Sequence, residues 1–483
     1  MKAFRTATRF FPAFERANQC GVVGWHGSLR NGVRATPKQS RIGPVTVVAI
    51  LAVGGSVPLL SKALRSQKSD SETSLRQAIE STTDSGVNLI HALSLEEATA
   101  KLKRDEYEGQ LGDVKFHFNR IASNNPVEDE FIYTSAPGEN GKPWHFWGVF
   151  DGHAGYETSR VLRRALVPYV SNDLQNSYKY PIIATIQKAF LSLDNDISNV
   201  ALAALSQPPA SPTAIAALAP FVAGSCALLS IYDPSTSILR VACVGDSRAV
   251  LGRWNPETNS YTMIPLSEDQ TGFNASENSR ISAAHPGENN ILTPKDGRML
   301  GIAITRAFGD HRWKWTREQI VAVKEKFLGS SVRPEYKTPP YMTAEPVVTE
   351  TQVRKGEKGD FVIMASDGFW DRISSEDAVE CLGKWLDMRR NQGLEPEGQK
   401  NCQGDSEIEV KENQHLSYKA EPKFFVYEDE NAATHLIKNC LGGSRREFFR
   451  GIMTTYPHIS RDVRDDVTMH VIFFGDESLN SKT

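Results

Sequence analysis

Four separated segments of the 483-residue chain each place an aspartate directly after an apolar run or close beside one. A fifth segment, "NNPVEDEF", carries an adjacent glutamate and aspartate. Carboxylates are hard oxygen ligands of the kind that Mg²⁺ and Mn²⁺ prefer. The residues concerned are Asp151 in "VFDGHAG", Asp246 in "VGDSR", Asp367 in "MASDGFWD", Asp465 in "VRDDVTMHVIFF", and the pair Glu128 and Asp129.

The position of these carboxylates favours a shared site. Each aspartate alone could be an ordinary residue of a turn that ends a strand, but such a coincidence at five places is hard to attribute to turns alone. Glycine follows both Asp151 and Asp367, and the missing Cβ lets the backbone approach an ion closely. Carboxylates brought together without a cation would repel one another and be forced toward protonation. If the strand ends converge, the sequence predicts a binuclear metal centre.

The elements that must position these residues follow from hydrophobic patterning. Short, β-rich apolar runs bounded by Gly, Asp or Pro predict strands, and apolar residues at three- and four-residue spacing predict helices. "YDPSTS" joins two expected strands as a turn, which favours antiparallel pairing and a layered α+β fold over a doubly wound sheet. Strands are expected at 146–150, 226–232, 238–244, 361–366 and 468–474, and helices at 157–174, 182–205 and 375–388.

The folded domain is expected to span residues 85–477. Two stretches within it lack the apolar content for a core of their own and are expected to be surface insertions. The first, near 206–220, is rich in Pro and Ala, and the second, near 391–426, begins with a long polar run.

The N-terminal region has a different composition. The first 41 residues carry eight Lys or Arg against the single acid Glu15, which predicts a mitochondrial targeting segment over 1–44, with a disordered basic tail as the alternative. Residues 45–60 are apolar but too short to span a bilayer comfortably, so an inner-membrane anchor and a removable sorting segment both stay open. Residues 61–84 are expected to be a linker.

Overall composition excludes some functions. The net charge of -3 gives no general attraction to nucleic acid or to anionic membranes. The six cysteines are scattered without a C-x-x-C pair, so reduced structural thiols are expected and a zinc site is not.

The motifs resemble those of a known family. "VFDGHAG", "VGDSRAVLG", "ASDGFWD" and "RDDVT", in this order, are similar to the signature motifs of the PP2C-type metal-dependent protein serine/threonine phosphatases. "RAFGDHRWKW" and "YPHISRDVRDDVT" most resemble the pyruvate dehydrogenase phosphatase branch and its mitochondrial fungal relatives. The resemblance implies a four-layer α-β-β-α sandwich, with two central antiparallel sheets flanked by paired helices.

The resemblance also implies metal-binding roles. Two or three Mg²⁺ or Mn²⁺ ions are expected, with a metal-bridging water as the nucleophile that attacks the phosphate. By resemblance Asp151 bridges two ions, Gly152 offers its carbonyl to one, and Asp367 and Asp465 hold the other. Glu128 and Asp129 would act mostly through metal-bound waters, and Asp246 would join Asp367 at a third, weaker site.

Three further residues receive roles or raise questions through the resemblance. His153 matches the family histidine that protonates the departing Ser or Thr oxygen, a role that suits a pKa near neutrality. Asn124 stands where many members have an arginine that grips the substrate phosphate, so it is expected to donate only a neutral hydrogen bond. Asp466 replaces the usual asparagine after the metal aspartate, where its added charge is expected to tune metal affinity.

The expected function is hydrolysis of phosphoserine or phosphothreonine on a mitochondrial protein, with the E1 alpha subunit of pyruvate dehydrogenase as the candidate substrate. A catalytically inactive phosphatase fold that serves as a binding scaffold is one alternative. A metal-dependent hydrolase of small phosphate esters is another. The sequence does not decide whether the protein acts in the mitochondrial matrix or in the intermembrane space. It also leaves open whether residues 45–60 associate with the inner membrane.

Overall fold

The computed structural model describes residues 91–475, except 177–179, 328, 391–408, 411–415 and 458. All of these described residues belong to one compact unit, Asn88–Thr483. The targeting segment expected at 1–44, the hydrophobic segment at 45–60 and the linker at 61–84 lie outside the described residues. Across the described ranges, no helix is both long enough and apolar enough to cross a membrane.

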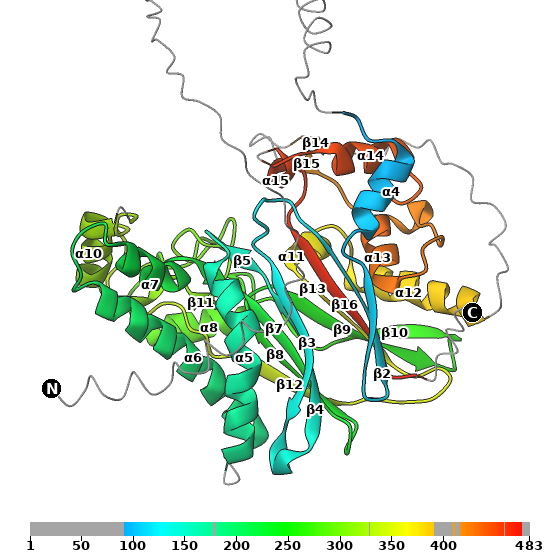
Figure 1. Cartoon of the computed structure of the whole chain (residues 1–483), viewed down its shortest axis with the longest axis horizontal. Coiled ribbons are helices and arrows are strands. Elements are labelled where there is room, and N and C mark those ends of the chain that lie inside the picture. The colour runs from blue at the N-terminus through cyan, green and yellow to red at the C-terminus, as the bar shows by residue number, and fades with distance from the viewer. Residues whose placement is uncertain are drawn as a thin grey trace, which may run out of the picture. The chain divides into compact units, whose positions relative to one another are not determined.

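Two antiparallel sheets form the centre of the described part of the chain (Figure 1). The strands expected at 146–150, 226–232, 238–244, 361–366 and 468–474 are all present, and β7 pairs with β8 antiparallel, as the turn between them predicts. The six-stranded sheet has the order β1 (Tyr107–Leu111), β2 (Val114–Ile121), β16 (Val467–Phe473), β13 (Phe361–Ala365), β9 (Arg248–Asn255) and β10 (Ser260–Pro265). The five-stranded sheet has the order β12 (Val347–Gln352), β8 (Ile238–Val244), β7 (Ala227–Asp233), β4 (Pro143–Phe150) and β3 (Glu130–Pro137).

The two sheets pack face to face because alternate side chains of each strand point to opposite faces. In β13, Val362 and Met364 lie in the core between the sheets. Phe361, Ile363 and Ala365 of the same strand face the helices on the outer side. Both faces of the sheet are therefore buried, which explains why the central strands are nearly continuous apolar runs.

Helices cover both outer faces (Figure 1). The helices predicted at 157–174, 182–205 and 375–388 are α5, α6 and α12, and the observed architecture is the expected four-layer α+β sandwich. On the five-stranded sheet lie α5 (Glu157–Asn176) and α6 (Ile182–Ala204), and on the six-stranded sheet lie α12 (Ser375–Arg390) and α13 (Ala432–Cys440), with α4 (Leu95–Lys103) packed between α13 and α14 (Arg446–Thr454). The connections contain α8 (Ala275–Ala284), α9 (His311–Lys314), α10 (Arg317–Phe327), α11 (Asp367–Trp370) and α15 (Ser460–Val463).

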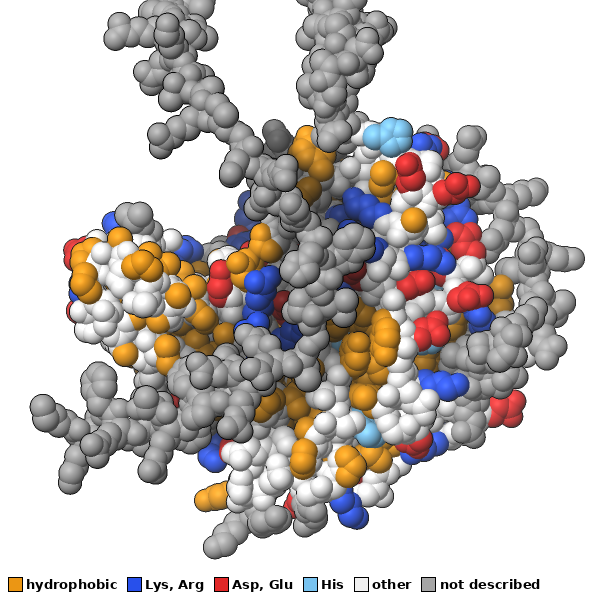
Figure 2. Space-filling model, in the orientation of Figure 1, with side chains coloured by type: hydrophobic (Ala, Val, Ile, Leu, Met, Phe, Trp, Pro, Cys, Tyr) orange, Lys and Arg blue, Asp and Glu red, His pale blue; other side chains and the backbone are white. Residues whose placement is uncertain are grey.

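The structure differs from the surface loop expected near 206–220. Residues Pro212–Val222 form α7, whose N-cap Ser211 accepts a hydrogen bond from the Ala214 N–H. Leu218 and Phe221 are buried in the core shared with α5 and α6, whereas Ile215 is 49% exposed. An Ala-rich segment without a core of its own can thus fold by packing on neighbouring helices. Figure 2 shows hydrophobic side chains gathered at this end of the molecule, over α6, α7 and α10.

The second expected insertion, near 391–426, is described only in part. Residues 391–408 and 411–415 lie outside the described ranges. Of the remainder, Tyr418, Phe424 and Val426 are buried rather than exposed. The Phe424 carbonyl accepts the Ser444 N–H at 2.8 Å, so this part of the segment packs against the region between α13 and α14.

Candidate active site

The predicted acidic residues lie at strand ends on one edge of the sandwich. Asp151 follows β4, Asp367 begins α11 directly after β13, and Asp465 stands two residues before β16. Ala365, the last residue of β13, pairs with Met469 of β16 and with Arg248 of β9. The end of β13 and the starts of β16 and β9 therefore meet at the same edge. Asp246 lies in the turn before β9, and Glu128 and Asp129 lie just before β3.

Two glycines allow these segments to approach each other. A Cβ on Gly368 would lie 2.2 Å from the carbonyl oxygen of Asp466, and a Cβ on Gly152 would lie 2.3 Å from that of Glu128. Real Cβ atoms do not come this close to a backbone oxygen, so only glycine fits at either position. The first contact brings α11 and its Asp367 against the segment that carries Asp465. The second brings the Asp151 segment against the loop before β3.

The carboxylates share one electrostatic environment. Burial raises the pKa of Asp151 well above its usual value, and the charges of Asp367 and Asp129 raise this pKa further. Burial also raises the pKa of Asp367, with the charges of Asp246 and Asp465 next in effect. The pKa of Asp246 rises to about 6, again chiefly through burial. Residues from five sequence segments therefore destabilise one another's charged forms, and this is the condition that a bound cation relieves.

The donor set fits a hard divalent cation. Asp129 is 1% exposed, and its Oδ2 atom has no hydrogen-bond partner among the described residues. A buried polar atom without a partner is costly, and a cation would supply one. Asp151, Asp367 and Asp465 stay partly exposed, so an ion could reach them. Within the described ranges, no group of three or more His, Cys, Asp or Glu side chains is close enough together to hold a metal ion by side chains alone.

Glu128 is held by three donors from three segments. Its Oε1 accepts the Gly155 N–H at 2.8 Å, and its Oε2 accepts Nη1 of Arg461 at 3.0 Å and Nδ2 of Asn124 at 3.3 Å. Arg461 also lies 3.4 Å from Asp465. Sequence reasoning did not single out Arg461. Its position four residues before Asp465 could have identified it as a site residue, because residues at that spacing share one face of a helical turn.

His153 is positioned by a small third sheet. In this sheet β6 (Gly224–Ser225) pairs with both β5 (Gly152–His153) and β11 (Phe308–Gly309). The pairing brings the imidazole Nε2 of His153 to 2.7 Å from Oδ2 of Asp310, the residue after β11. A Cβ on Gly224 would lie 2.1 Å from that Nε2 atom and 2.4 Å from the Asp310 oxygen. The His153–Asp310 pair therefore packs directly against Gly224, and any side chain at position 224 would collide with it.

The His153–Asp310 pair favours a protonated imidazole. Burial lowers the pKa of His153, but the charge of Asp310 and the hydrogen bond to it raise the pKa, and the net shift is upward. The His153 side chain is 23% exposed, whereas that of Asp310 is 2% exposed. The imidazole can therefore reach a substrate while Asp310 stays behind it. Asp310 lies in the motif "RAFGDHRWKW", but its role could not be predicted from the sequence because its partner lies 157 residues away.

Cys226, one of the cysteines expected from the sequence to be reduced structural thiols, contacts a predicted metal ligand. Its Sγ donates a hydrogen bond to Oδ1 of Asp246 at 3.3 Å. Burial and the charges of Asp246 and Asp151 raise the pKa of this thiol well above its usual value. Cys226 is therefore a neutral thiol that holds the Asp246 carboxylate in place.

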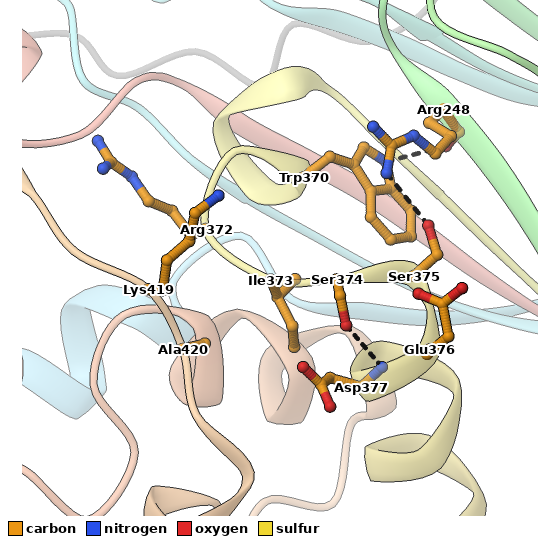
Figure 3. Close-up of a pocket in the computed structure, with 10 residues that line it drawn as sticks. All are labelled: Arg248, Trp370, Arg372, Ile373, Ser374, Ser375, Glu376, Asp377, Lys419 and Ala420. Carbon is orange, nitrogen blue, oxygen red and sulfur yellow. Dashed lines mark hydrogen bonds between the residues drawn. The ribbon is translucent and has the colours of Figure 1, made fainter.

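A cavity of about 400 Å³ lies beyond these residues, at the start of α12 (Figure 3). It is lined by Trp370, by the loop that follows α11, and by Lys419 and Ala420 from a distant segment. Arg248 also lines it, with its guanidinium carbon 5.2 Å from the centroid of the Trp370 ring and its Nη1 donating to the Ser375 hydroxyl at 3.1 Å. None of the predicted metal ligands lines this cavity, and the candidate site lies outside it.

Comparison with known proteins assigns the chain to a class. Residues 115–403 match the family model described as "Protein phosphatase 2C". The chain is 40% identical, over 381 residues, to "Protein phosphatase 2C homolog C10F6.17c" of Schizosaccharomyces pombe, an alignment that covers 76% of this chain and 82% of that protein. The chain therefore belongs to the protein phosphatase 2C family, and it is a protein serine/threonine phosphatase.

Two further relatives define the branch. The mitochondrial pyruvate dehydrogenase phosphatase 1 of Saccharomyces cerevisiae is 36% identical over 411 residues, covering 77% of this chain and 70% of that protein. The mitochondrial pyruvate dehydrogenase phosphatase 2 of Homo sapiens is 27% identical over 431 residues, covering 76% of this chain and 79% of that protein. These relatives support the pyruvate dehydrogenase phosphatase-like branch that the motifs predicted.

Proposed function

We propose that this chain hydrolyses phosphoserine and phosphothreonine on a mitochondrial protein in a Mg²⁺- or Mn²⁺-dependent reaction. The supporting observation is the placement of the His153–Asp310 pair beside a group of carboxylates whose charges raise one another's pKa values. An acid that can protonate a departing alkoxide thus adjoins a site suited to cations. Uncatalysed phosphate monoester hydrolysis is among the slowest reactions known, so both contributions are needed.

The metal ligands in this proposal come from both sheets and their connections. Bound divalent ions supply positive charge to the phosphoryl group and make water a stronger nucleophile at neutral pH. Two or three ions would be held by Asp151, the Gly152 carbonyl, Asp367, Asp465, Glu128, Asp129 and Asp246.

The remaining groups act on the substrate directly. His153 donates the proton that the serine or threonine oxygen takes as its bond to phosphorus breaks, and Asp310 keeps that proton on the imidazole beforehand. Asn124 offers one neutral N–H donor and no charge, so it contributes less to phosphate capture than an arginine would. Its contact with Glu128 keeps it beside the carboxylates.

We further propose that the substrate is the E1 alpha subunit of pyruvate dehydrogenase and that the protein acts in mitochondria. Support comes from the names of the yeast and human relatives and from the basic, acid-poor first 41 residues. Membrane association through 45–60 and the choice between matrix and intermembrane space stay predictions from the sequence.

The test is phosphate release from a phosphoserine peptide of E1 alpha by the purified full chain. Activity should require added Mn²⁺ or Mg²⁺, disappear with EDTA, and be lost in Asp151→Asn. Equal turnover in chelator would rule out this mechanism. Peptide binding without turnover would favour a catalytically inactive binding scaffold. A preference for small phosphate esters over phosphoprotein would favour a metal-dependent hydrolase of small phosphate esters. Phosphopeptides that accumulate in mitochondria lacking the active protein would identify the substrate.

A further inference from the structure

The backbone N–H groups of the loop at 122–129 need hydrogen-bond partners from outside the two sheets. It connects β2, in the six-stranded sheet, with β3, in the five-stranded sheet, and it carries Glu128 and Asp129 at its end. A loop that crosses between two sheets leaves the ladders of both, so its backbone N–H groups need partners elsewhere. Because Asp129 and Ser123 are buried, water cannot readily provide those partners.

Asp466 provides them. One of its oxygens, Oδ1, accepts the N–H of Ser123 at 2.5 Å, the hydroxyl of Ser123 at 2.7 Å and the N–H of Asn124 at 3.3 Å. The other, Oδ2, accepts the N–H of Glu128 at 3.0 Å and that of Asp129 at 3.4 Å. A single side chain thus binds both ends of the loop, across a sequence separation of up to 343 residues.

These contacts also show which way Asp466 points. The side chain is 3% exposed, and both of its oxygens face N–H and O–H donors of the loop. Arg464, 2% exposed, lies close enough for the Asp466 charge to raise the Arg464 pKa, although burial of Arg464 lowers that pKa more. Both oxygens of Asp466 therefore have donors of their own. The orientation adds a structural role to the charge effect expected from the sequence, and the Asp466 charge also contributes, after burial, to raising the pKa of Asp129.

We propose that Asp466 is a positioning residue, which sets divalent-metal affinity by fixing the backbone of 123–129 so that Glu128 and Asp129 face the site. The inference rests on the proposed metal-dependent function but concerns the loop rather than the reaction. It requires a carboxylate and not an amide. An asparagine has one acceptor oxygen, so its NH₂ group would face either the Ser123 and Asn124 donors or the Glu128 and Asp129 donors, and one end of the loop would be released.

The test is Asp466→Asn in the full chain, a change that installs the residue more usual in the family. We expect Mn²⁺ binding, measured by calorimetry without substrate, to weaken about tenfold or more, because charge-assisted bonds to one end of the loop are lost. In the metal-free protein, amide hydrogen exchange at 123–129 should accelerate by a similar factor. Turnover at saturating Mn²⁺ should recover to within about threefold of the parent, because the reacting groups are unchanged.

A matched control separates positioning from general stability. Asp233→Asn removes a comparable carboxylate, which accepts the Ser235 N–H and the hydroxyls of Ser235 and Thr236 in the β7–β8 turn. It should lower thermal stability without changing Mn²⁺ affinity. If Asp466→Asn does not fold, Ser123→Ala removes one hydroxyl bond to the same carboxylate and should weaken Mn²⁺ binding in the same direction, by a smaller factor.

The outcomes are distinct. Parent-like Mn²⁺ affinity together with parent-like exchange at 123–129 in Asp466→Asn would overturn the inference, even if the parent is an active phosphatase. Faster exchange and weaker Mn²⁺ binding would support it, even if the parent proves inactive on phosphoprotein.

Discussion

Gly224→Ala offers a direct test of the role given to His153. The added Cβ would stand 2.1 Å from Nε2 of His153 and 2.4 Å from Oδ2 of Asp310. Ordinary contact needs at least 3.4 Å, so the imidazole and the carboxylate must separate or move. A displacement of roughly 1 Å at a reacting group can lower a rate by about a hundredfold. We expect about that loss in kcat on a phosphoserine peptide.

The assay compares two leaving groups. Serine alkoxide needs a proton as it departs, whereas p-nitrophenolate leaves readily without one, so hydrolysis of p-nitrophenyl phosphate should fall by much less, about tenfold at most. Gly112→Ala is the control, because its Cβ would lie 2.5 Å from Nε2 of His145, which is not one of the predicted site residues. That variant should lose stability and keep both activities. An equal loss on both substrates in Gly224→Ala would refute proton donation by His153.

Two further predictions concern stability. Burial lowers the pKa values of His117, His435 and His470 to about 3 from 6.5, so their stabilising effect is complete above pH 6.5 and is lost as pH falls toward 3. At pH 5 the contribution of each of these histidines to the free energy of unfolding should be about 2 kcal/mol lower than above pH 6.5. His470→Gln should reduce the number of protons taken up on urea unfolding at pH 5 by about one. Glu277 is 1% exposed and paired with Arg306 at 2.6 Å, so Glu277→Gln should cost about 3 kcal/mol in urea unfolding at pH 7. A pH-independent urea midpoint in the first case, or an unchanged midpoint in the second, would contradict these expectations.

The sequence allowed the main elements to be predicted because their signals are local. The continuous apolar run in "FVIMAS" predicts a strand, and β13, buried on both faces, is found there. The helix at 212–222 escaped prediction because its Ala-rich sequence has no core of its own. Leu218 and Phe221 become buried only against α5 and α6, which a linear reading does not bring together.

The candidate site was predictable to the same extent. Aspartates at strand ends, with glycines after two of them, are visible in the sequence. The partners that orient them are not, because Asp310 and Asp466 act across 157 and 343 residues through pairings that only the folded sheets create. Asp466 illustrates the difference. Its charge was visible beside Asp465, but its direction depends on where the loop before β3 runs.

The strand order makes the six-stranded sheet depend on residues 467–473. Strand β16 is assembled from Val467–Phe473, yet it occupies an inner position between β2 and β13. A nascent polypeptide that has not reached these residues lacks an inner strand of one sheet, together with the anchor for Ser123 and Glu128. Catalytic competence should consequently appear all at once, and only after Val467–Phe473 have been synthesised. Truncation before Val467 should yield an insoluble or unfolded product rather than a partly active one.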